Sequence, residues 1–329
     1  MIRPLFRAPA AAAAVALLAA GCANANGSPA PVGLEKPNLV VAAVPAADSS
    51  GVYIAEQKGL FAAEGLHVTI QPAISSETVI AQQLAGKIDV SAGAYPSYIS
   101  QNVEHHSDLE ILAAGSIMQP RNQEIMIPAR SPIRTIQDLK GKTIAVNAPK
   151  NIVQLLVSAL LRDNGMSVRQ VHFVAIPFPF MADALQKHEF QGKHVDIDAA
   201  AMPEPFVTFA EESIGARPLA DEDAGAAHNL PISGFVVTKT WAQKYPRTAA
   251  AFLTALRAAQ RIADTDPAAV EKAVEQYSKV PPTAAAVMAV PSFPLNTDPV
   301  LLQRVADLMR QFKYPLPQGF KVNQMILHG

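Results

Sequence analysis

Short apolar runs and longer stretches with helical spacing alternate along most of this chain, and the alternation restricts its fold more than any other feature. Residues 38–44 form an apolar run with β-branched side chains, residues 67–71 and 89–92 are predicted to be further strands, and the stretches at 51–63 and 77–85 are predicted to be helical. Strands and helices that alternate in this way form βαβ units around a mostly parallel sheet. The sequence therefore predicts an α/β fold.

The pattern continues along the chain and changes towards its end. Further strands are predicted at residues 110–116, 124–128, 143–147, 171–175, 197–201 and 232–238, and further helices at 96–103, 151–164 and 179–187. The last part is predicted to be helical, at residues 240–245, 247–264, 267–278, 283–290 and 299–311. Several of these helices have proline in the first turn, where the missing N–H leaves no hydrogen bond unmade.

Composition and motifs exclude several classes of protein. Hydrophobic residues make up 50% of the chain and charged residues 17%, as in a well-packed globular protein, and 27 basic against 28 acidic side chains give no argument for nucleic acid. The sequence has no phosphate-binding loop, dinucleotide fingerprint or nucleophile elbow. The pairs His105–His106 and Asp196–Asp198 lack the further ligands that a metal site needs. We therefore predict no catalytic residue, no metal and no cofactor.

The only cysteine of the chain, Cys22, follows an apolar N-terminal segment. Arg3 and Arg7 precede an apolar stretch at residues 10–20, and small residues lead to the cysteine, which is the order of a secretory signal. The stretch is too short to span a membrane, because the hydrocarbon core needs roughly 20 helical residues.

Residues 17–22, LLAAGC, resemble a bacterial lipobox, in which the cysteine is lipidated and becomes the mature N-terminus. Ala19 stands where that motif usually has leucine. The sequence predicts a lipoprotein signal peptide over residues 1–21, lipidation at Cys22, and a flexible linker rich in Asn, Gly, Ser and Pro over residues 22–37. An incidental cysteine in an ordinary secretory signal is the alternative.

Five segments in a fixed order carry a resemblance to a known family. They read GVYIAEQKGLFAAEGLHVTI, QQLAGKIDVSAGAYPSYI, DLKGKTIAVNAPKNIVQLLVSALL, VDIDAAAMPEPF and GFVVTKTWAQKYP. In this order the chain resembles the solute-binding proteins of bacterial ABC importers, in the branch that serves uptake of nitrate, sulfonates, taurine and thiamine precursors. The resemblance covers about residues 38–312.

The resemblance implies a two-lobe periplasmic-binding-protein-like fold of type II, with a ligand cleft between the lobes and a helical C-terminal part. Lobe I would comprise residues 38–122 plus 232–329, and lobe II residues 123–231. The implied protein is a monomeric, non-enzymatic receptor, lipid-anchored at the extracytoplasmic face of the cell membrane. It would deliver a small-molecule solute to an ABC permease with a cytoplasmic ATPase.

Polar residues at the strand-to-helix junctions are the predicted ligand contacts. In open α/β sheets ligands bind beyond the carboxyl ends of the strands, where helix N-termini present unpaired N–H groups. The predicted substrate-binding residues are Ser49, Ser50, Tyr53, Ser75, Ser76, Tyr95, Ser97, Asn147, Lys150, Asn151, Glu204 and Ser233. At each junction, an ordinary helix cap is the alternative.

Charge leaves two ligand classes open. Lys150, at the start of a predicted helix, favours a small organic oxyanion of the sulfonate, nitrate and taurine class. Glu77 and Glu204 would favour an amine, as in a thiamine-pyrimidine-type heteroaromatic precursor. The sequence predicts the oxyanion; the heteroaromatic solute and a lipid-anchored enzyme on the same fold are the alternatives.

Two further features depart from the pattern of the family. Many relatives have tryptophan directly before the Glu-Pro pair, where this chain has Pro203, so Phe178 or Phe180 is the candidate for an aromatic wall of the cleft, with core packing as the alternative. Residues 187–194 make a longer connection than usual and are predicted to be a surface loop.

Overall fold

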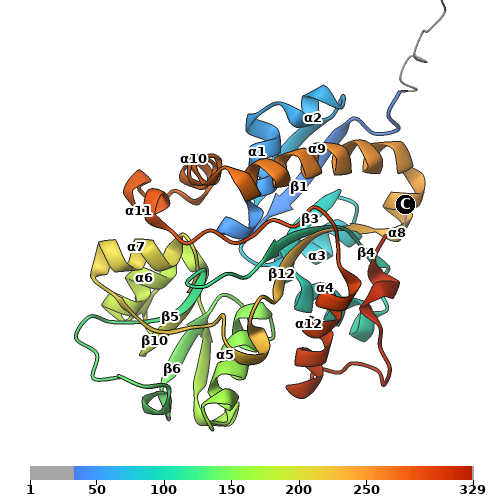
Figure 1. Ribbon diagram of the computed structural model, residues 1–329. Helices are drawn as coiled ribbons and strands as arrows, with labels where there is room; N and C mark the ends of the chain where they lie inside the picture. Colours follow the sequence, from blue (N-terminus) through green and yellow to red (C-terminus); the bar gives the residue numbers. More distant parts are fainter. Residues whose placement is uncertain (1–32, 328–329) are drawn as a thin grey trace, which may run out of the picture. The chain divides into compact units, whose positions relative to one another are not determined.

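The computed structural model describes residues 33–327, and its compact unit begins at Leu34. Cys22, the predicted signal peptide and most of the predicted linker lie outside the described residues. Two five-stranded sheets form the framework of the compact unit (Figure 1). Within the described residues, no helix combines the length and the hydrophobicity that crossing a membrane requires.

The first sheet has the strand order β2-β1-β3-β12-β4. Its strands are β1 (Asn38–Ala43), β2 (His67–Pro72), β3 (Val90–Ala94), β4 (Leu109–Ile117) and β12 (Pro231–Thr238). β1 runs parallel to β2 and β3, whereas β12 runs antiparallel to β3 and β4. A strand from late in the sequence thus lies between two early ones.

The second sheet has the strand order β11-β5-β10-β6-β7. Its strands are β5 (Gln123–Ile127), β6 (Thr143–Val146), β7 (His172–Ala175), β10 (Ala199–Pro203) and β11 (Arg217–Asp221). β6 is parallel to β7 and β10, but β5 is antiparallel to β10 and β11. In each sheet four of the five strands therefore run in one direction, as the prediction of a mostly parallel sheet requires. The exceptions are β12 and β5, the strands that follow the two passages between the sheets, which run in the opposite direction.

The helices of the described residues occupy most of the predicted ranges. They are α1 (Ser50–Gln57), α2 (Leu60–Ala63), α3 (Ser76–Leu84), α4 (Tyr95–His105), α5 (Ile152–Asp163), α6 (Phe178–Lys187), α7 (Phe206–Ile214), α8 (Lys239–Lys244), α9 (Pro246–Thr265), α10 (Pro267–Ser278), α11 (Pro282–Val287) and α12 (Pro299–Gln311). In α12 the buried residues Leu302, Val305, Ala306 and Met309 recur at helical spacing, so one face packs inward. Phe61 of α2 stacks on Phe252 of α9 with ring centroids 5.0 Å apart, which joins two distant parts of the chain (Figure 1).

Two local predictions need correction, and two elements were missed. The helix predicted at residues 51–63 is broken between α1 and α2, because Gly59 takes a left-handed conformation with φ 67°. The predicted loop at 187–194 holds a small hairpin of β8 (Glu189–Phe190) and β9 (Lys193–His194), whose turn residues Gln191 and Gly192 both have positive φ. Helix α7 and strand β11 were not predicted.

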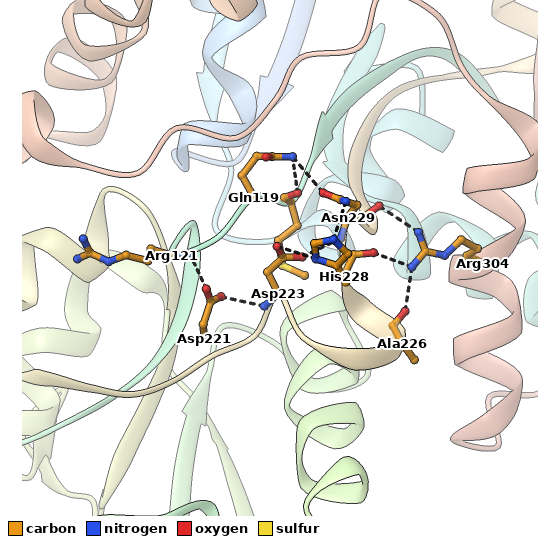
Figure 2. A network of polar contacts seen from close by, with 9 residues as sticks. Gln119, Arg121, Asp221, Asp223, Ala226, His228, Asn229 and Arg304 are labelled. Carbon is orange, nitrogen blue, oxygen red and sulfur yellow. Dashed lines mark hydrogen bonds and ion pairs between the residues drawn. The ribbon is translucent and has the colours of Figure 1, made fainter.

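The chain passes between the two sheets twice, and polar contacts tie the two passages together (Figure 2). Gln119, in the first passage, donates from Nε2 to Oδ1 of Asn229 in the second at 3.3 Å. Arg304 of α12 donates to the carbonyl oxygens of Ala226, His228 and Asn229 at 3.2, 2.6 and 3.3 Å. The second passage is therefore held by the first passage and by α12.

Candidate ligand cavity

A cavity lies where the carboxyl ends of strands from both sheets meet. Residues after β1 and at the end of β3 line it from the first sheet, and residues after β6 and β7 and at the end of β10 line it from the second. Its volume is about 40 Å³, enough for about three water molecules. The position is the one at which open α/β sheets bind ligands.

On the first side of the cavity, two facing glycines let polar groups approach the sheet closely. Gly93 of β3 is paired with Gly234 of β12. A Cβ atom at Gly93 would lie 2.3 Å from Oγ of Ser76, and one at Gly234 would lie 2.5 Å from the ring of Tyr95. Ser76 opens α3, and its Oγ accepts a hydrogen bond from the N–H of Ala94 at 2.9 Å. The start of α3 can therefore lie directly against the end of β3.

The first side also carries a carboxyl group, that of Asp48. Its Oδ1 accepts a hydrogen bond from Oγ of Ser116 at 2.8 Å, and the hydroxyl of Ser116 lies 3.0 Å from that of Ser233. Burial raises the pKa of Asp48 to about 6, although the hydrogen bond from Ser116 lowers it. Within the described residues Asp48 makes no ion pair. Among the residues that line the cavity it is the only titratable side chain.

On the second side, two asparagines shape the N-terminus of α5. Asn151 is the N-cap: its Oδ1 accepts hydrogen bonds from the N–H groups of Val153 at 3.1 Å and Gln154 at 3.4 Å. Its Nδ2 donates to Oδ1 of Asn147. Asn147 therefore uses its oxygen as an acceptor, and its Nδ2 donates no hydrogen bond to another described residue. The second side thus offers hydrogen-bond donors.

Gln123, the first residue of β5, adds a further donor. The residue is 1% exposed, and its Nε2 has no hydrogen-bond partner within the described part of the chain. A buried donor without an acceptor costs roughly 1–3 kcal/mol. A ligand atom that accepts this hydrogen bond would offset the cost.

One of the two aromatic candidates lines the cavity. Phe178 is buried and stacks on Phe206 of α7 with ring centroids 5.8 Å apart, so the same ring is part of the core and of the cavity wall. Phe180 is 54% exposed and packs against Phe190 of the small hairpin.

The structure brings together some of the residues that the sequence predicted as ligand contacts and separates others. Those that line the cavity are Ser49, Ser76, Asn147, Asn151 and Ser233. Ser50, Tyr53, Ser75, Tyr95, Ser97, Lys150 and Glu204 do not line it. Each of the latter residues has another place in the structure.

Around α1 the excluded residues serve packing. Oγ of Ser50 donates to the carbonyl oxygen of Ala47 at 2.8 Å and lies 3.1 Å from the hydroxyl of Tyr277. Tyr53 stacks on the ring of Tyr277 with centroids 3.9 Å apart. Burial raises the pKa of Tyr53 to about 12, so its hydroxyl stays neutral. Both side chains therefore hold α1 against α10.

Around α3 and α4 the residues that do not line the cavity make local hydrogen bonds or pack elsewhere. Ser75 precedes α3, where its backbone exchanges hydrogen bonds with the side chain of Thr78. Ser97 donates to a carboxylate oxygen of Glu77. Tyr95 lines a different cavity and fills the space beside Gly234.

The two charged candidates are also directed elsewhere. Lys150 is exposed and has φ 57°, and its backbone N–H donates to Oε1 of Gln154 at 2.7 Å. Glu204 is buried, and its carboxylate accepts from the N–H and hydroxyl of Thr208 and from the N–H of Ala289. Glu204 thus fixes α7, and the cavity has no cationic side chain among its lining residues.

The lining residues that were not among the predicted contacts include Asp48, Gln123 and Phe178. Asp48 stands in a predicted junction, next to Ser49, and Phe178 was an aromatic candidate only. Gln123 gave one weak signal, a polar residue directly before an apolar strand. Among the described residues, no group of three or more His, Cys, Asp or Glu side chains could hold a metal ion.

Comparison with known structures shows the fold. The alkanesulfonate-binding protein SsuA from Xanthomonas axonopodis pv. citri, bound to MOPS, is 20% identical; the match covers 90% of this chain and 100% of that one, with a TM-score of 0.73. The periplasmic nitrate-binding protein NrtA from Synechocystis PCC 6803 is 15% identical over 89% of this chain and 86% of its own, with a TM-score of 0.72. The periplasmic aliphatic sulphonate-binding protein SsuA from Escherichia coli is 19% identical over 88% of this chain and 97% of its own, with a TM-score of 0.68. The predicted fold class, that of a periplasmic binding protein, is confirmed.

Sequence comparison gives the family. No curated protein matches the chain at a significant level. The family model described as NMT1/THI5 like matches residues 46–270, a range that includes every residue lining the cavity except Val44. The chain belongs to the NMT1/THI5-like family.

Proposed function

We propose that this protein is the extracytoplasmic solute-binding protein of an ABC importer, and that it captures a small organic oxyanion in the cavity between the two sheets. The observation that carries the proposal is a set of neutral hydrogen-bond donors without acceptors in one cavity. Nε2 of Gln123 is buried without a partner, and the amide hydrogens of Asn147 have no acceptor within the described residues. Ser76 Oγ already accepts one hydrogen bond, so its own hydrogen is available to a ligand.

Helix N-termini add to this donor set. Ser76 and Ile152, the first residues of α3 and α5, both line the cavity. Each helix N-terminus carries about half a positive charge and presents N–H groups that favour an anion. Hydrogen bonds to an ionised acceptor are roughly twice as strong as neutral ones. An oxyanion can therefore be bound here without Lys150.

The structural relatives support the same class of ligand. Those named above are described as binding alkanesulfonate, aliphatic sulphonate and nitrate, all of which present several anionic oxygens on one centre. At 15–20% identity they share the fold with this chain, and the donor set in its own cavity is the independent argument for the ligand.

The proposal includes a movement of the two sides. The cavity has room for a few atoms only, so a larger solute enters when the two sheets separate about the passages drawn in Figure 2. The moving parts would be lobe I, residues 38–122 plus 232–329, and lobe II, residues 123–231. A solute that contacts both would stabilise the closed form by its difference in affinity for the two states. Small-angle scattering with and without solute measures this compaction.

The proposal also includes the place of action. The protein would be a monomer held at the outer face of the membrane by lipid on Cys22, within reach of its permease. Replacing Cys22 with Ser should release it from the membrane fraction without lowering its unfolding temperature, because the compact unit begins at Leu34. A membrane fraction that does not change would contradict the anchor and leave the ligand proposal standing.

Calorimetric titration of the purified protein with nitrate, ethanesulfonate and a panel of aminopyrimidines tests the ligand. We expect at least one oxyanion to bind, and Gln123→Ala and Asn147→Ala each to weaken it roughly 10- to 150-fold, the equivalent of about 1.5–3 kcal/mol for a hydrogen bond to a charged group. Gln318→Ala is the matched control, because Gln318 is exposed and outside the cavity. If only aminopyrimidines bind, the oxyanion hypothesis fails and the solute is a heteroaromatic one. The ring of Phe178 in the cavity wall is the observation that favours this second class of ligand.

A further inference from the structure

The carboxyl group of Asp48 is the one feature of the cavity that a simple anion does not explain. The side chain lies between β1 and α1 and lines the same cavity as the donors of Gln123, Asn147 and Ser76. An ionised Asp48 would repel an oxyanion in so small a space, because both charges are negative and little water separates them. The cavity therefore holds two kinds of polar group that call for different partners.

The protein itself does little to neutralise Asp48. The hydroxyl of Ser116 supplies one hydrogen bond, to Oδ1. From α10, Tyr277 directs its hydroxyl hydrogen to the carbonyl oxygen of Ala46 at 2.7 Å, and from β12 the hydroxyl of Ser233 lies beside that of Ser116. No Lys, Arg or His side chain within the described residues pairs with Asp48. Asp48 is only partly exposed to solvent, and a carboxylate that is largely withdrawn from water is normally paired with a cation or given several donors.

We infer that the solute carries a protonated amine in addition to its oxyanion, and that Asp48 is the residue that selects for the amine. The inference rests on the proposed function, since the donors of Gln123, Asn147 and Ser76 would bind the oxyanion end. The ammonium group of the solute would be the cationic partner that Asp48 does not have in the protein. It would also donate hydrogen bonds to the carboxylate in addition to the one from Ser116. The ligand class is a short amino-substituted oxyanion, such as an aminoalkanesulfonate or a β-amino acid.

This arrangement excludes two simpler solutes. An unsubstituted alkanesulfonate or nitrate would leave Asp48 unpaired and close to like charge, whereas a simple amine would leave the donors of Gln123 and Asn147 without an acceptor. Each mismatch leaves a buried polar group unsatisfied, which is the strongest basis on which a site rejects an analogue. Asp48 would thus act in specificity rather than in overall affinity.

Matched pairs of solutes test the inference by calorimetric titration. Taurine and ethanesulfonate form one pair, and β-alanine and propionate form the other; within each pair the amine is the main difference. We expect the wild-type protein to bind the amino member of a pair at least about tenfold more tightly. Asp48→Asn should remove that preference and bind the unsubstituted member as tightly as the wild type or more tightly. Asp183→Asn, a substitution at an exposed residue of α6, should change neither affinity.

Asn at position 48 keeps the size of the side chain and an oxygen that can accept from Ser116, so the variant should fold, and its thermal unfolding checks this. If the wild-type protein binds ethanesulfonate as tightly as taurine, or if Asp48→Asn keeps the preference, the inference is overturned and the oxyanion function stands. If no member of either pair binds and nitrate does not bind either, the oxyanion function itself fails, and the inference with it.

Discussion

The two sides of the cavity are built by different means. The first side depends on backbone proximity: Gly93 and Gly234 face each other, and Ser76 lies against the sheet where a Cβ atom would be. The second side depends on side chains that hold one another, with Asn151 capping α5 and bonding to Asn147. The first side should therefore be sensitive to added volume, and the second to the loss of a hydrogen bond or a ring.

The largest effect is expected on the second side, from Phe178→Ala. Phe178 is 5% exposed and stacks on Phe206, so removing its ring leaves a void in the core beside the cavity. The free energy of unfolding should fall by about 3–5 kcal/mol. Phe180→Ala, at a side chain that is 54% exposed, should change it by no more than about 0.5 kcal/mol. Urea unfolding measures the free energy of unfolding of both variants. Equal losses would mean that the ring of Phe178 stabilises the fold no more than the exposed ring of Phe180.

The next effect tests the close approach on the first side. Gly93→Ala places a methyl group 2.3 Å from Oγ of Ser76 and 2.9 Å from the hydroxyl of Tyr98, so the start of α3 has to shift. We expect a loss of about 1–3 kcal/mol in the free energy of unfolding and weaker solute binding. Gly33→Ala is the control, because nothing lies within 4 Å of a Cβ atom there. If Gly93→Ala is as stable as the control, the first side of the cavity does not depend on the close approach of Ser76 to Gly93.

Asp48, on the first side of the cavity, should make the stability of the protein depend on pH. The pKa of Asp48 is raised to about 6 from an ordinary value of 3.8, so the folded protein holds a proton that the unfolded chain has already lost between these values. Stability should therefore decrease as the pH rises from about 4 to 6, with the penalty complete above pH 6. Allowing for partial exposure, the difference between Asp48→Asn and the wild type should grow by about 1–2 kcal/mol in favour of the variant over this window.

Urea unfolding of both proteins at pH 4, 5, 6 and 7, without solute, gives the difference. A difference that stays constant with pH would show that Asp48 is not dehydrated in the cavity. A bound ammonium should cancel the trend, because it stabilises the ionised form, and solute binding by the wild type should strengthen as the pH rises through 6.

The smallest effect is expected from the helix cap on the second side. Asn151→Ala removes the oxygen that accepts from the N–H groups of Val153 and Gln154, and should lower the free energy of unfolding by about 1 kcal/mol. Asn151→Asp keeps the cap and should keep most of the stability. Thermal unfolding of the two variants measures the difference, and equal stabilities would indicate that the cap contributes little beside the packing of α5.

The sequence determined the elements because their signals are local. The strand predicted at residues 232–238 is Pro231–Thr238, and the helix predicted at 299–311 is Pro299–Gln311. The spacing of hydrophobic residues, helix caps and proline in the first turn all act over a few residues. One sequence is therefore enough to predict the helices and strands that they specify. The same signals put Ser49, Ser76, Asn147 and Asn151 at junctions, and these residues do line the cavity. Helix α7 shows that a local signal can be missed, since Gly215 marks its end in a left-handed conformation.

Only the tertiary structure decided which junction residues face one another. β12 lies between β3 and β4 although it is far from both in sequence, and this pairing puts Ser233 beside Ser116 and Asp48. Lys150 satisfies the sequence pattern of an anion site, yet its left-handed backbone conformation leaves it exposed and outside the cavity. Gln123 becomes a donor in the cavity because β5 enters the second sheet beside β10. The direction of a side chain at a junction depends on long-range strand pairing and on the φ and ψ angles of one or two residues, and periodicity along the chain specifies neither.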